Sequence, residues 1–320
     1  MIILNQDILD FYLETSMYTN YIPFQKYYQT LPDDIKKLCD LIHHQIIHRR
    51  SLIRSYTGKY AFYENTSEME SIKEQYPWYK NRCDDDILLT ASSITAELIR
   101  LDQRGFTLDR KIPDKIVLTC RYSAVLLASI LKAKHIPARV RSGYCDYMLD
   151  EDAREQEYYD HWIVQYYDNQ RKQWVNVDAS GLYAKTFPYY DFPDSEFQWV
   201  AEIWLDVRKG KKDCHNYIHG FGRNSLRNLA QALFFDFHAL MNQEMSYMFS
   251  PVCLSSEEKF QRFTDAEFSK LDLLAELMLE PDKNFTKLRE MYENDSWYRV
   301  INTPLVGDND HLEILENVEV

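Results

Sequence analysis

The sequence has 320 residues, of which 45% are hydrophobic and 27% are charged, and 37 Lys and Arg stand against 50 Asp and Glu for a formal net charge of −13. This composition can bury a core and is not typical of a disordered chain, and the acidic balance disfavours general nucleic-acid binding, which needs cations to neutralise phosphates. Only 8 glycines occur, and the absence of both GxGxxG and GxxxxGK[ST] excludes nucleotide-binding loops of these two kinds.

The start of the chain does not have the pattern of a signal peptide. It lacks a basic segment, and Asp7, Asp10 and Glu14 interrupt its apolar residues. The sequence contains no uninterrupted run of about 18 apolar residues, the length that would predict a membrane span. We therefore expect a cytoplasmic protein without membrane contact. Its cysteines form no CxxC pair, so a disulfide framework is not expected; they are Cys39, Cys83, Cys120, Cys145, Cys214 and Cys253.

Residues 1–84 are predicted to form a helical N-terminal region. Apolar spacing predicts a helix over 35–47, after the start signal Pro32–Asp33–Asp34. A second helix is expected to open at Asp84–Asp85–Asp86, because acidic residues favour the first turn of a helix. The polar and aromatic stretch 58–78 between them is predicted to be a long loop.

Residues 85–195 are predicted to form a core of the α+β class. An apolar helix over 120–134 ends at His135–Ile136–Pro137, and β-rich runs follow it, two of them separated by the turn-like Asp168–Asn169–Gln170. A helix followed by antiparallel-capable strands indicates α+β organisation. The predicted strands cover 138–144, 161–167 and 173–178.

Residues 196–320 are predicted to form a helical C-terminal region that packs on this core. A stripe of apolar residues from Leu226 to Met241 has the spacing of a long amphipathic helix, with Asn224 or Ser225 as its cap. Two shorter helices are expected around 265–279 and 284–292. The length of the chain agrees with about two domains, or with one domain that carries large additions.

Three residues of the core have the types that nucleophilic attack on an amide requires. Cys120 stands in the first turn of the apolar helix, where N–H groups and the helix dipole stabilise a thiolate and hold an oxyanion. His161 begins one strand and Asp178 ends the next, so a hairpin places their side chains together. A thiolate needs a neighbouring imidazole and a polar group that orients the imidazole. The sequence therefore predicts a catalytic set of Cys120, His161 and Asp178.

The motifs around these residues resemble the transglutaminase-like superfamily. They are CRYSAVLLASILKAKHIPARV, which begins at Cys120, then Asp160–His161–Trp162, and then Trp174–Val–Asn–Val–Asp178. The resemblance extends over residues 85–185 and implies a papain-like α+β core, in which a central helix packs on a small antiparallel sheet. It implies that Cys120 is the nucleophile, that His161 is the acid and base, and that Asp178 orients the histidine.

The activity that this resemblance implies is acyl transfer from an amide through a cysteine thioester. The superfamily includes transglutaminases, bacterial cysteine-protease-like enzymes and peptide:N-glycanases, so the acceptor is water or an amine. Some positions depart from the common pattern: Trp162 follows His161 directly, Gln165 replaces an acid, and Leu118–Thr119 precede Cys120 in place of glycine. No DxDxDG-like calcium loop is present, and neither a metal nor a cofactor is expected.

Two alternatives stay open. A lone cysteine on an apolar helix is most often a core residue. The alternative to an enzyme is therefore a catalytically silent transglutaminase-like scaffold that binds a protein partner. Cys214–His215 with His219 suggest a metal site, but a second pair of ligands is missing. The backbone N–H of Cys120 is the one oxyanion donor that the sequence indicates.

Charge is distributed unevenly around the predicted site. The segment Arg100–Arg141 has ten Lys and Arg against three Asp, whereas Asp146–Asp160 has seven acids against Arg154. The acidic stretch leads directly into His161, so it is either a solvated loop or a feature of the cleft that favours cationic substrates. The expected substrate is a peptide, a protein or a small amide, with cationic amides as the specific alternative.

Overall fold

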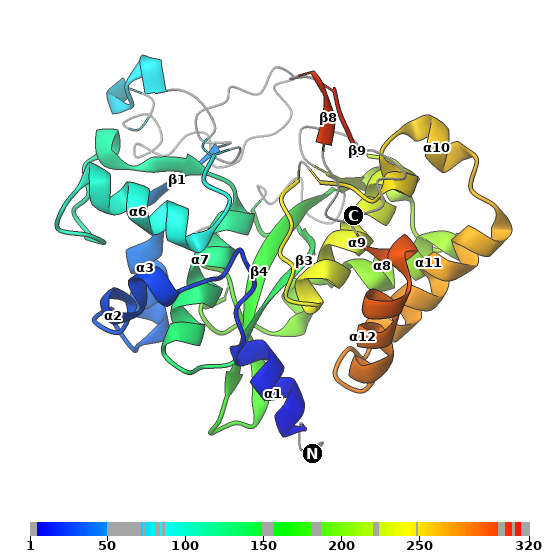
Figure 1. Ribbon diagram of the computed structural model, residues 1–320, viewed down its shortest axis with the longest axis horizontal. Helices are drawn as coiled ribbons and strands as arrows, with labels where there is room; N and C mark the ends of the chain where they lie inside the picture. Colours follow the sequence, from blue (N-terminus) through cyan, green and yellow to red (C-terminus); the bar gives the residue numbers. More distant parts are fainter. Residues whose placement is uncertain are drawn as a thin grey trace.

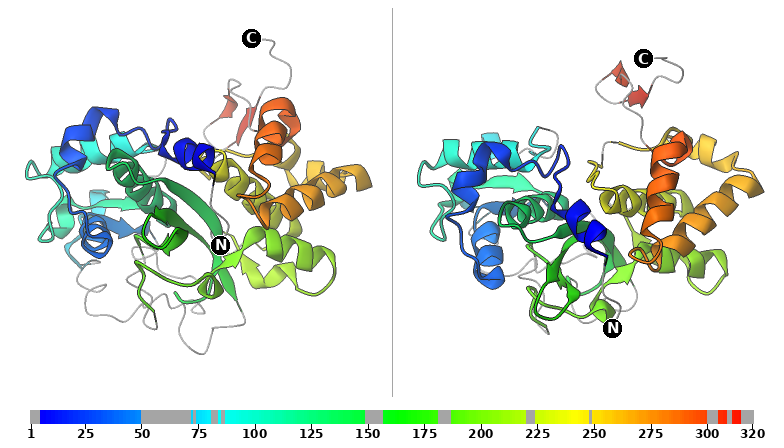
Figure 2. Two further views of the ribbon diagram at one scale, coloured as in Figure 1. Left: turned by 90° about the horizontal axis from the view of Figure 1, so that it is seen from below. Right: turned by 60° about the horizontal axis from the view of Figure 1, so that its bottom comes forward.

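A five-stranded sheet lies between an N-terminal and a C-terminal group of helices (Figures 1 and 2). The structure is a computed structural model that describes residues 5–49, 72, 74–80, 84, 87–148, 157–180, 187–219, 224–247, 249–299, 305–308 and 311–314. The described helices are α1 (Gln6–Leu13), α2 (Gln25–Tyr28), α3 (Ile35–His43), α6 (Ala91–Leu101), α7 (Cys120–Ala133), α8 (Val200–Arg208), α9 (Leu226–Leu240), α10 (Glu257–Gln261), α11 (Asp265–Met278) and α12 (Phe285–Asn294). The described strands are β1 (Ile46–His48), β2 (Ile116–Leu118), β3 (Ala138–Cys145), β4 (Tyr158–Asp168), β5 (Gln173–Val177), β6 (Gln198–Trp199), β7 (Tyr217–Ile218), β8 (Leu305–Asp308) and β9 (His311–Ile314).

The sheet is built on an antiparallel arrangement of β3, β4 and β5, with β4 in the middle. The short β6 pairs with β3, and the short β7 runs parallel to the start of β4. Side chains alternate between the two faces of a strand. Val140 of β3 therefore packs under α7, whereas its neighbour Arg141 reaches α9 on the other face. The sheet thus separates α7 from α9.

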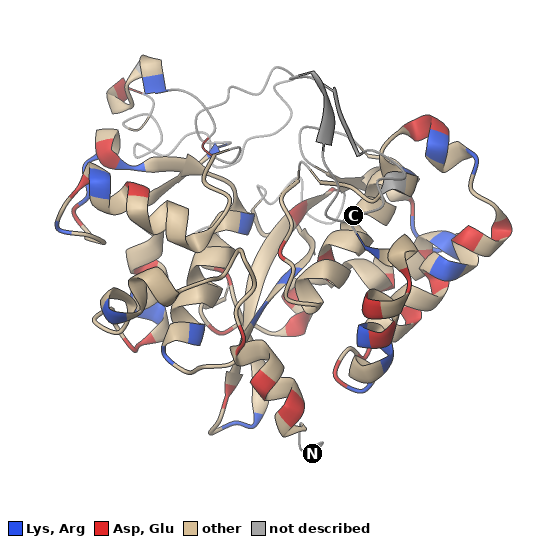
Figure 3. Cartoon of the chain, viewed as in Figure 1, with Lys and Arg blue, Asp and Glu red and all other residues tan. Residues whose placement is uncertain are grey.

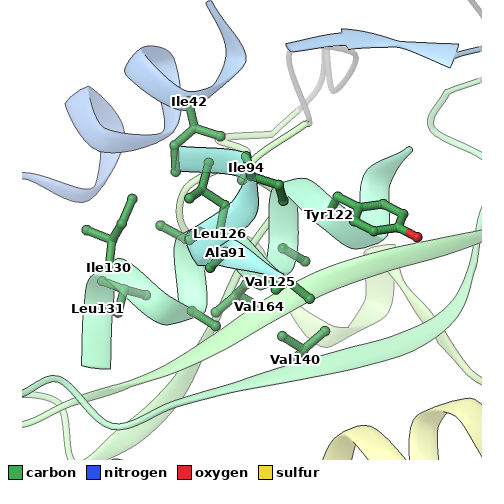
Figure 4. Packing of buried hydrophobic residues seen from close by; sticks show 14 of the residues in the cluster. Ile42, Ala91, Ile94, Tyr122, Val125, Leu126, Ile130, Leu131, Val140 and Val164 are labelled. Carbon is green, nitrogen blue, oxygen red and sulfur yellow. The ribbon is translucent and has the colours of Figure 1, made fainter. Parts of the chain in front are cut away.

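Helix α7 is the centre of the largest hydrophobic cluster. All 14 of its residues are buried. Ile42 of α3 and Ile94 of α6 belong to the same cluster, as do Val140 and Val164 of the sheet (Figure 4). A helix that is covered on all sides has to be apolar around its whole circumference, which explains the almost continuous apolar sequence.

The predicted α+β core, with a central helix packed on an antiparallel sheet, is confirmed. The predicted core helix and its three strands correspond to α7, β3, β4 and β5, and the long C-terminal helix corresponds to α9, capped by Ser225. The two later helices correspond to α11 and α12. The largest hydrophobic cluster contains residues of all three predicted regions, from Tyr18 to Met245, and the boundaries at 84 and 195 stay a prediction.

Two predictions for the N-terminal region were wrong. The helix predicted over 35–47 ends at His43, because Ile46 and Ile47 pair in parallel with β2 instead. The second helix begins at Ala91 behind a Thr90 cap rather than at the acidic run. Asp84 instead accepts a hydrogen bond from the N–H of Val117. Most of the loop predicted over 58–78 lies outside the described residues.

None of the helices that the structure describes is both long enough and apolar enough to cross a bilayer.

A buried ion pair fixes α9 to the sheet. The guanidinium of Arg141 donates to both carboxylate oxygens of Asp236, at 2.9 and 2.8 Å, and the N–H of Ser142 donates to one of them. The side chains of Arg141 and Asp236 are 4% and 0% exposed. A bidentate contact of this kind sets both the distance and the orientation of the two elements.

We expect Asp236→Ala to lower the free energy of unfolding by about 3–5 kcal/mol, because it leaves the Arg141 charge buried without an opposite charge to compensate it. Urea denaturation measures the effect. Glu293→Ala is the matched control: it breaks the exposed Arg289–Glu293 pair on α12, whose side chains are 45% and 53% exposed, and should cost about 0–1 kcal/mol. Equal losses for the two variants would contradict this account of the buried pair.

Candidate active site

Cys120 is the first residue of α7 and follows directly from the strand β2 through Thr119. Only 5% of Cys120 is exposed. The first N–H groups of a helix have no partner inside the helix, and the dipole makes this end partly positive. The sulfur therefore stands where the backbone favours negative charge.

His161 and Asp178 are brought together by the pairing of β4 with β5. Val164 lies opposite Val177, so Asp178 follows the end of β5 beside the start of the histidine strand. His161 Nε2 lies 2.8 Å from Asp178 Oδ2, and the two residues are 1% and 0% exposed. With Nε2 engaged by the carboxylate, Nδ1 is the ring nitrogen that can exchange a proton with sulfur.

The carboxylate of Asp178 is held by further donors. The Tyr147 hydroxyl donates to Oδ2 at 2.7 Å, and the Ser180 hydroxyl and N–H donate to Oδ1 at 2.7 and 2.9 Å. Burial alone would raise the pKa of Asp178, but the positive charge of His161 and the hydrogen bonds from His161, Ser180 and Tyr147 lower it. Asp178 is therefore ionised at neutral pH.

The environment of His161 favours its protonated form. Burial alone would lower the pKa of this imidazole, but the negative charges of Asp178 and Cys120, and the hydrogen bond to Asp178, raise it well above 6.5. The ring therefore carries its positive charge under the influence of both a carboxylate and a sulfur. This arrangement allows a thiolate–imidazolium pair, the form in which cysteine acts as a nucleophile.

Sequence reasoning missed three residues of this site. The ring of Tyr147 makes an edge-to-face contact with the ring of His161, with centroids 5.8 Å apart and planes at 89°. Ser180 follows Asp178 by two positions, a spacing typical of an Asx turn that could have indicated the contact. Tyr247 comes from the C-terminal region, and its hydroxyl lies 3.6 Å from Cys120 Sγ. No local pattern predicts such a distant contact.

Three of the positive charges in the segment 100–141 pair with acids from other parts of the fold. Lys134, Arg139 and Arg141 pair with Asp33, Asp282 and Asp236. In the view of Figure 3 the described basic and acidic residues are interspersed on the outer helices. The excess of positive charge that the segment 100–141 has in the sequence is therefore largely compensated by other parts of the fold. Residues 149–156 of the acidic stretch lie outside the described residues.

The candidate metal ligands of the sequence are separated. Asp213, Cys214 and His215 lie close enough to share an ion, within the part of the chain that the structure describes. However, the Asp213 carboxylate already accepts a hydrogen bond from the His215 N–H as the cap of a short 3-10 helix. His219 instead lies beside Asp160, at 3.3 Å. Capping accounts for the first group without a metal.

Comparison with known proteins identifies part of the chain. Residues 114–179 match the family model of the transglutaminase-like superfamily, and this segment contains Cys120, His161 and Asp178. No curated protein sequence matches the chain significantly. A crystal structure named "putative cysteine protease", from Cytophaga hutchinsonii, is similar at 17% identity and a TM-score of 0.33. The similarity covers 61% of this chain and 46% of that one, so it extends over less than half of the other protein.

We expect Asp178→Asn to slow the alkylation of Cys120 by iodoacetamide at pH 6–7 about 10-fold or more, because losing the carboxylate charge lowers the pKa of His161 and so disfavours the thiolate–imidazolium pair. The carboxylate charge favours the imidazolium, so its removal returns the proton to sulfur. Near pH 10 the two proteins should react at similar rates, since ordinary thiols are ionised at that pH without a neighbouring imidazolium.

Asp168→Asn is the matched control for that variant. It removes a carboxylate from the end of β4, the strand that carries His161, where Asp168 pairs with Arg171 on the surface. Its pH profile should coincide with that of the unmodified protein. A profile for Asp178→Asn that also coincides would show that the carboxylate does not support the ion pair.

Proposed function

We propose that this chain, which residues 114–179 place in the transglutaminase-like superfamily, is a cysteine enzyme that transfers the acyl group of an amide, with Cys120, His161 and Asp178 as its catalytic residues. The observation that carries the proposal is the buried contact between His161 Nε2 and Asp178 Oδ2 beside a cysteine at a helix N-terminus. This combination supplies a nucleophile, a proton carrier and an orienting charge in one place.

In the first half of the reaction, the thiolate of Cys120 adds to the carbonyl carbon. A carbon–sulfur bond forms, and the π electrons of the carbonyl move onto its oxygen. The carbonyl then re-forms from the oxyanion as the carbon–nitrogen bond breaks, and the electron pair of that bond stays on nitrogen, which takes the proton from Nδ1 of His161. The products are a Cys120 thioester and an amine.

In the second half, water resolves the thioester. Neutral His161 takes a proton from the water as the water oxygen adds to the acyl carbon and the carbonyl π electrons move onto the carbonyl oxygen. The carbonyl then re-forms as the carbon–sulfur bond breaks with its electrons on sulfur. A carboxylic acid leaves, and the thiolate–imidazolium pair is restored. Asp178 keeps the ring in one orientation throughout. We propose water rather than an amine as the acceptor, because water needs no binding site of its own.

A second candidate function is a catalytically silent scaffold that binds a protein partner. The observation that favours it is burial: Cys120 and His161 are only 5% and 1% exposed. A scaffold needs the fold alone, whereas an enzyme needs substrate to reach the sulfur. Reactivity of Cys120 therefore separates the two candidates.

If the chain is an enzyme, we expect Cys120 to become acylated when the protein is incubated with a library of peptide and small-molecule amides. Mass spectrometry of the acid-quenched protein should find the acyl group on Cys120, and both Cys120→Ala and His161→Ala should abolish it. His161→Ala should also remove the rapid alkylation of Cys120 by iodoacetamide at neutral pH, because no imidazolium remains to stabilise the thiolate.

The other cysteines serve as internal controls. Burial raises the pKa of the thiols of Cys39 and Cys145 well above the usual range, and that of Cys253 to about 12. These thiols should react slowly at pH 7. A Cys120 that is alkylated no faster than they are, and that carries no acyl group, would favour the scaffold.

The preference for cationic substrates stays a proposal that rests on charge. The acidic stretch before His161 would attract an amine-bearing amide. We expect that neutralising Glu151, Asp152, Glu155 and Glu157 together raises KM several-fold for cationic amides and leaves kcat and the KM for neutral amides unchanged. Steady-state kinetics on a matched pair of substrates measures this, and an equal effect on both substrates would remove the preference.

A further inference from the structure

The segment 242–247, called the strap here, runs along the nucleophile helix from one end to the other. Near the C-terminal end of α7, Lys132 Nζ donates to Asn242 Oδ1 at 2.9 Å. At the opposite end, the hydroxyl of Tyr247 lies 3.6 Å from Cys120 Sγ. The strap follows α9 and belongs to the C-terminal region, outside the segment that matches the superfamily model.

Arg121 ties the middle of the strap to the residue next to the nucleophile. Its guanidinium is fully buried and donates to the backbone carbonyls of Glu244 and Met245. It also lies over the rings of Tyr18 and Tyr122, at 5.0 and 4.5 Å from their centroids. A planar group between two rings and two carbonyls has a fixed orientation. The backbone just before Tyr247 is therefore held relative to Cys120.

The ring of Tyr247 is itself held by three aromatic neighbours. Trp162 of β4 and Phe235 of α9 each meet it at 88°, with centroids 6.0 and 5.9 Å away. His219 contacts it from a third side, at 6.2 Å and 66°. Edge-to-face contacts fix the plane of a ring as well as its position. The hydroxyl consequently faces the sulfur as part of a preorganised arrangement.

We propose that the Tyr247 hydroxyl is the second oxyanion donor of the site, with the N–H of Cys120 as the first, and that Arg121 is a positioning residue that acts through the strap. This inference rests on the proposed acyl transfer. During attack, negative charge moves from sulfur to an oxygen that is only two bonds away. A neutral hydroxyl that faces the sulfur in the resting site is therefore within reach of the developing oxyanion.

Two reagents that react with the same sulfur by different routes test this role. Acetyl transfer from p-nitrophenyl acetate passes through an oxyanion, whereas alkylation by iodoacetamide displaces iodide at carbon and forms none. In the full-length chain, Tyr247→Phe should slow acylation of Cys120 about 100-fold, the usual effect of losing one oxyanion donor. Alkylation should stay within twofold of the unmodified protein.

Tyr28→Phe is the matched control. Tyr28 also packs in the core around α7, where it is fully buried and Tyr247 is partly buried, but its hydroxyl contacts Thr95, away from the sulfur. Both rates should stay unchanged in this variant. Acylation that is also unchanged in Tyr247→Phe would overturn the proposed role. Acceleration of both reactions in Tyr247→Phe would overturn it too, since the hydroxyl would then shield the thiol.

A double variant tests the positioning role of Arg121. Arg121→Met should slow acylation and leave alkylation unchanged, and Arg121→Lys should restore part of the lost acylation rate. The combination Arg121→Met with Tyr247→Phe should be no slower than Tyr247→Phe alone, because the two residues act through one hydroxyl. Additive losses would overturn the positioning role.

Failure of the proposed function has a different signature. An unmodified protein that iodoacetamide alkylates at Cys120, but that neither the acetate ester nor any amide acylates, would overturn acyl transfer and the role of Tyr247 with it. A protein that is acylated at equal rates with and without the Tyr247 hydroxyl would overturn the role of Tyr247 alone.

Discussion

The complete burial of α7 is the constraint on which the rest of the structure depends. A nucleophile at the end of a helix can be held rigidly only if that helix is packed on every side, and here the sheet supplies one wall, while α3 and α6 supply another. Burial has a cost wherever α7 carries a polar group. Burial lowers the pKa of Lys132 to about 8, and its ammonium donates to the carbonyl of Glu14 and to Asn242.

These polar contacts give the helical additions a physical role in the core. Arg121 and Lys132 are buried on the same helix, and both find their acceptors on segments outside the superfamily match. The N-terminal region contributes the Glu14 carbonyl and the Tyr18 ring, and the C-terminal region contributes the strap. The two regions therefore satisfy donors that would otherwise be buried without partners. The additions are part of the structure that holds the nucleophile.

Local patterns in the sequence predicted the elements that carry the candidate catalytic residues. The apolar run from Cys120, the two alternating runs and the turn between them place His161 beside Asp178, because hairpin pairing follows from adjacency in the chain. The contacts that hold these residues were not predictable in this way. Ile46 and Ile47 have helical spacing but pair with a strand about seventy residues later. The local pattern of apolar residues contains no information about such a distant pairing partner. Tyr247 reaches Cys120 from still further along the chain.

The separation between these two residues also affects how the protein is made. Cys120 and Tyr247 are 127 positions apart, and Arg121 and Met245 are 124 apart. At a synthesis rate of about 5–20 residues per second, the thiol leaves the ribosome about 6–25 s before the segment that covers it. The core around α7 contains residues from Tyr18 to Met245, so it cannot close before the segment around Met245 has been made. Assembly of the candidate site is thereby coupled to the synthesis of a segment that lies well beyond the catalytic residues.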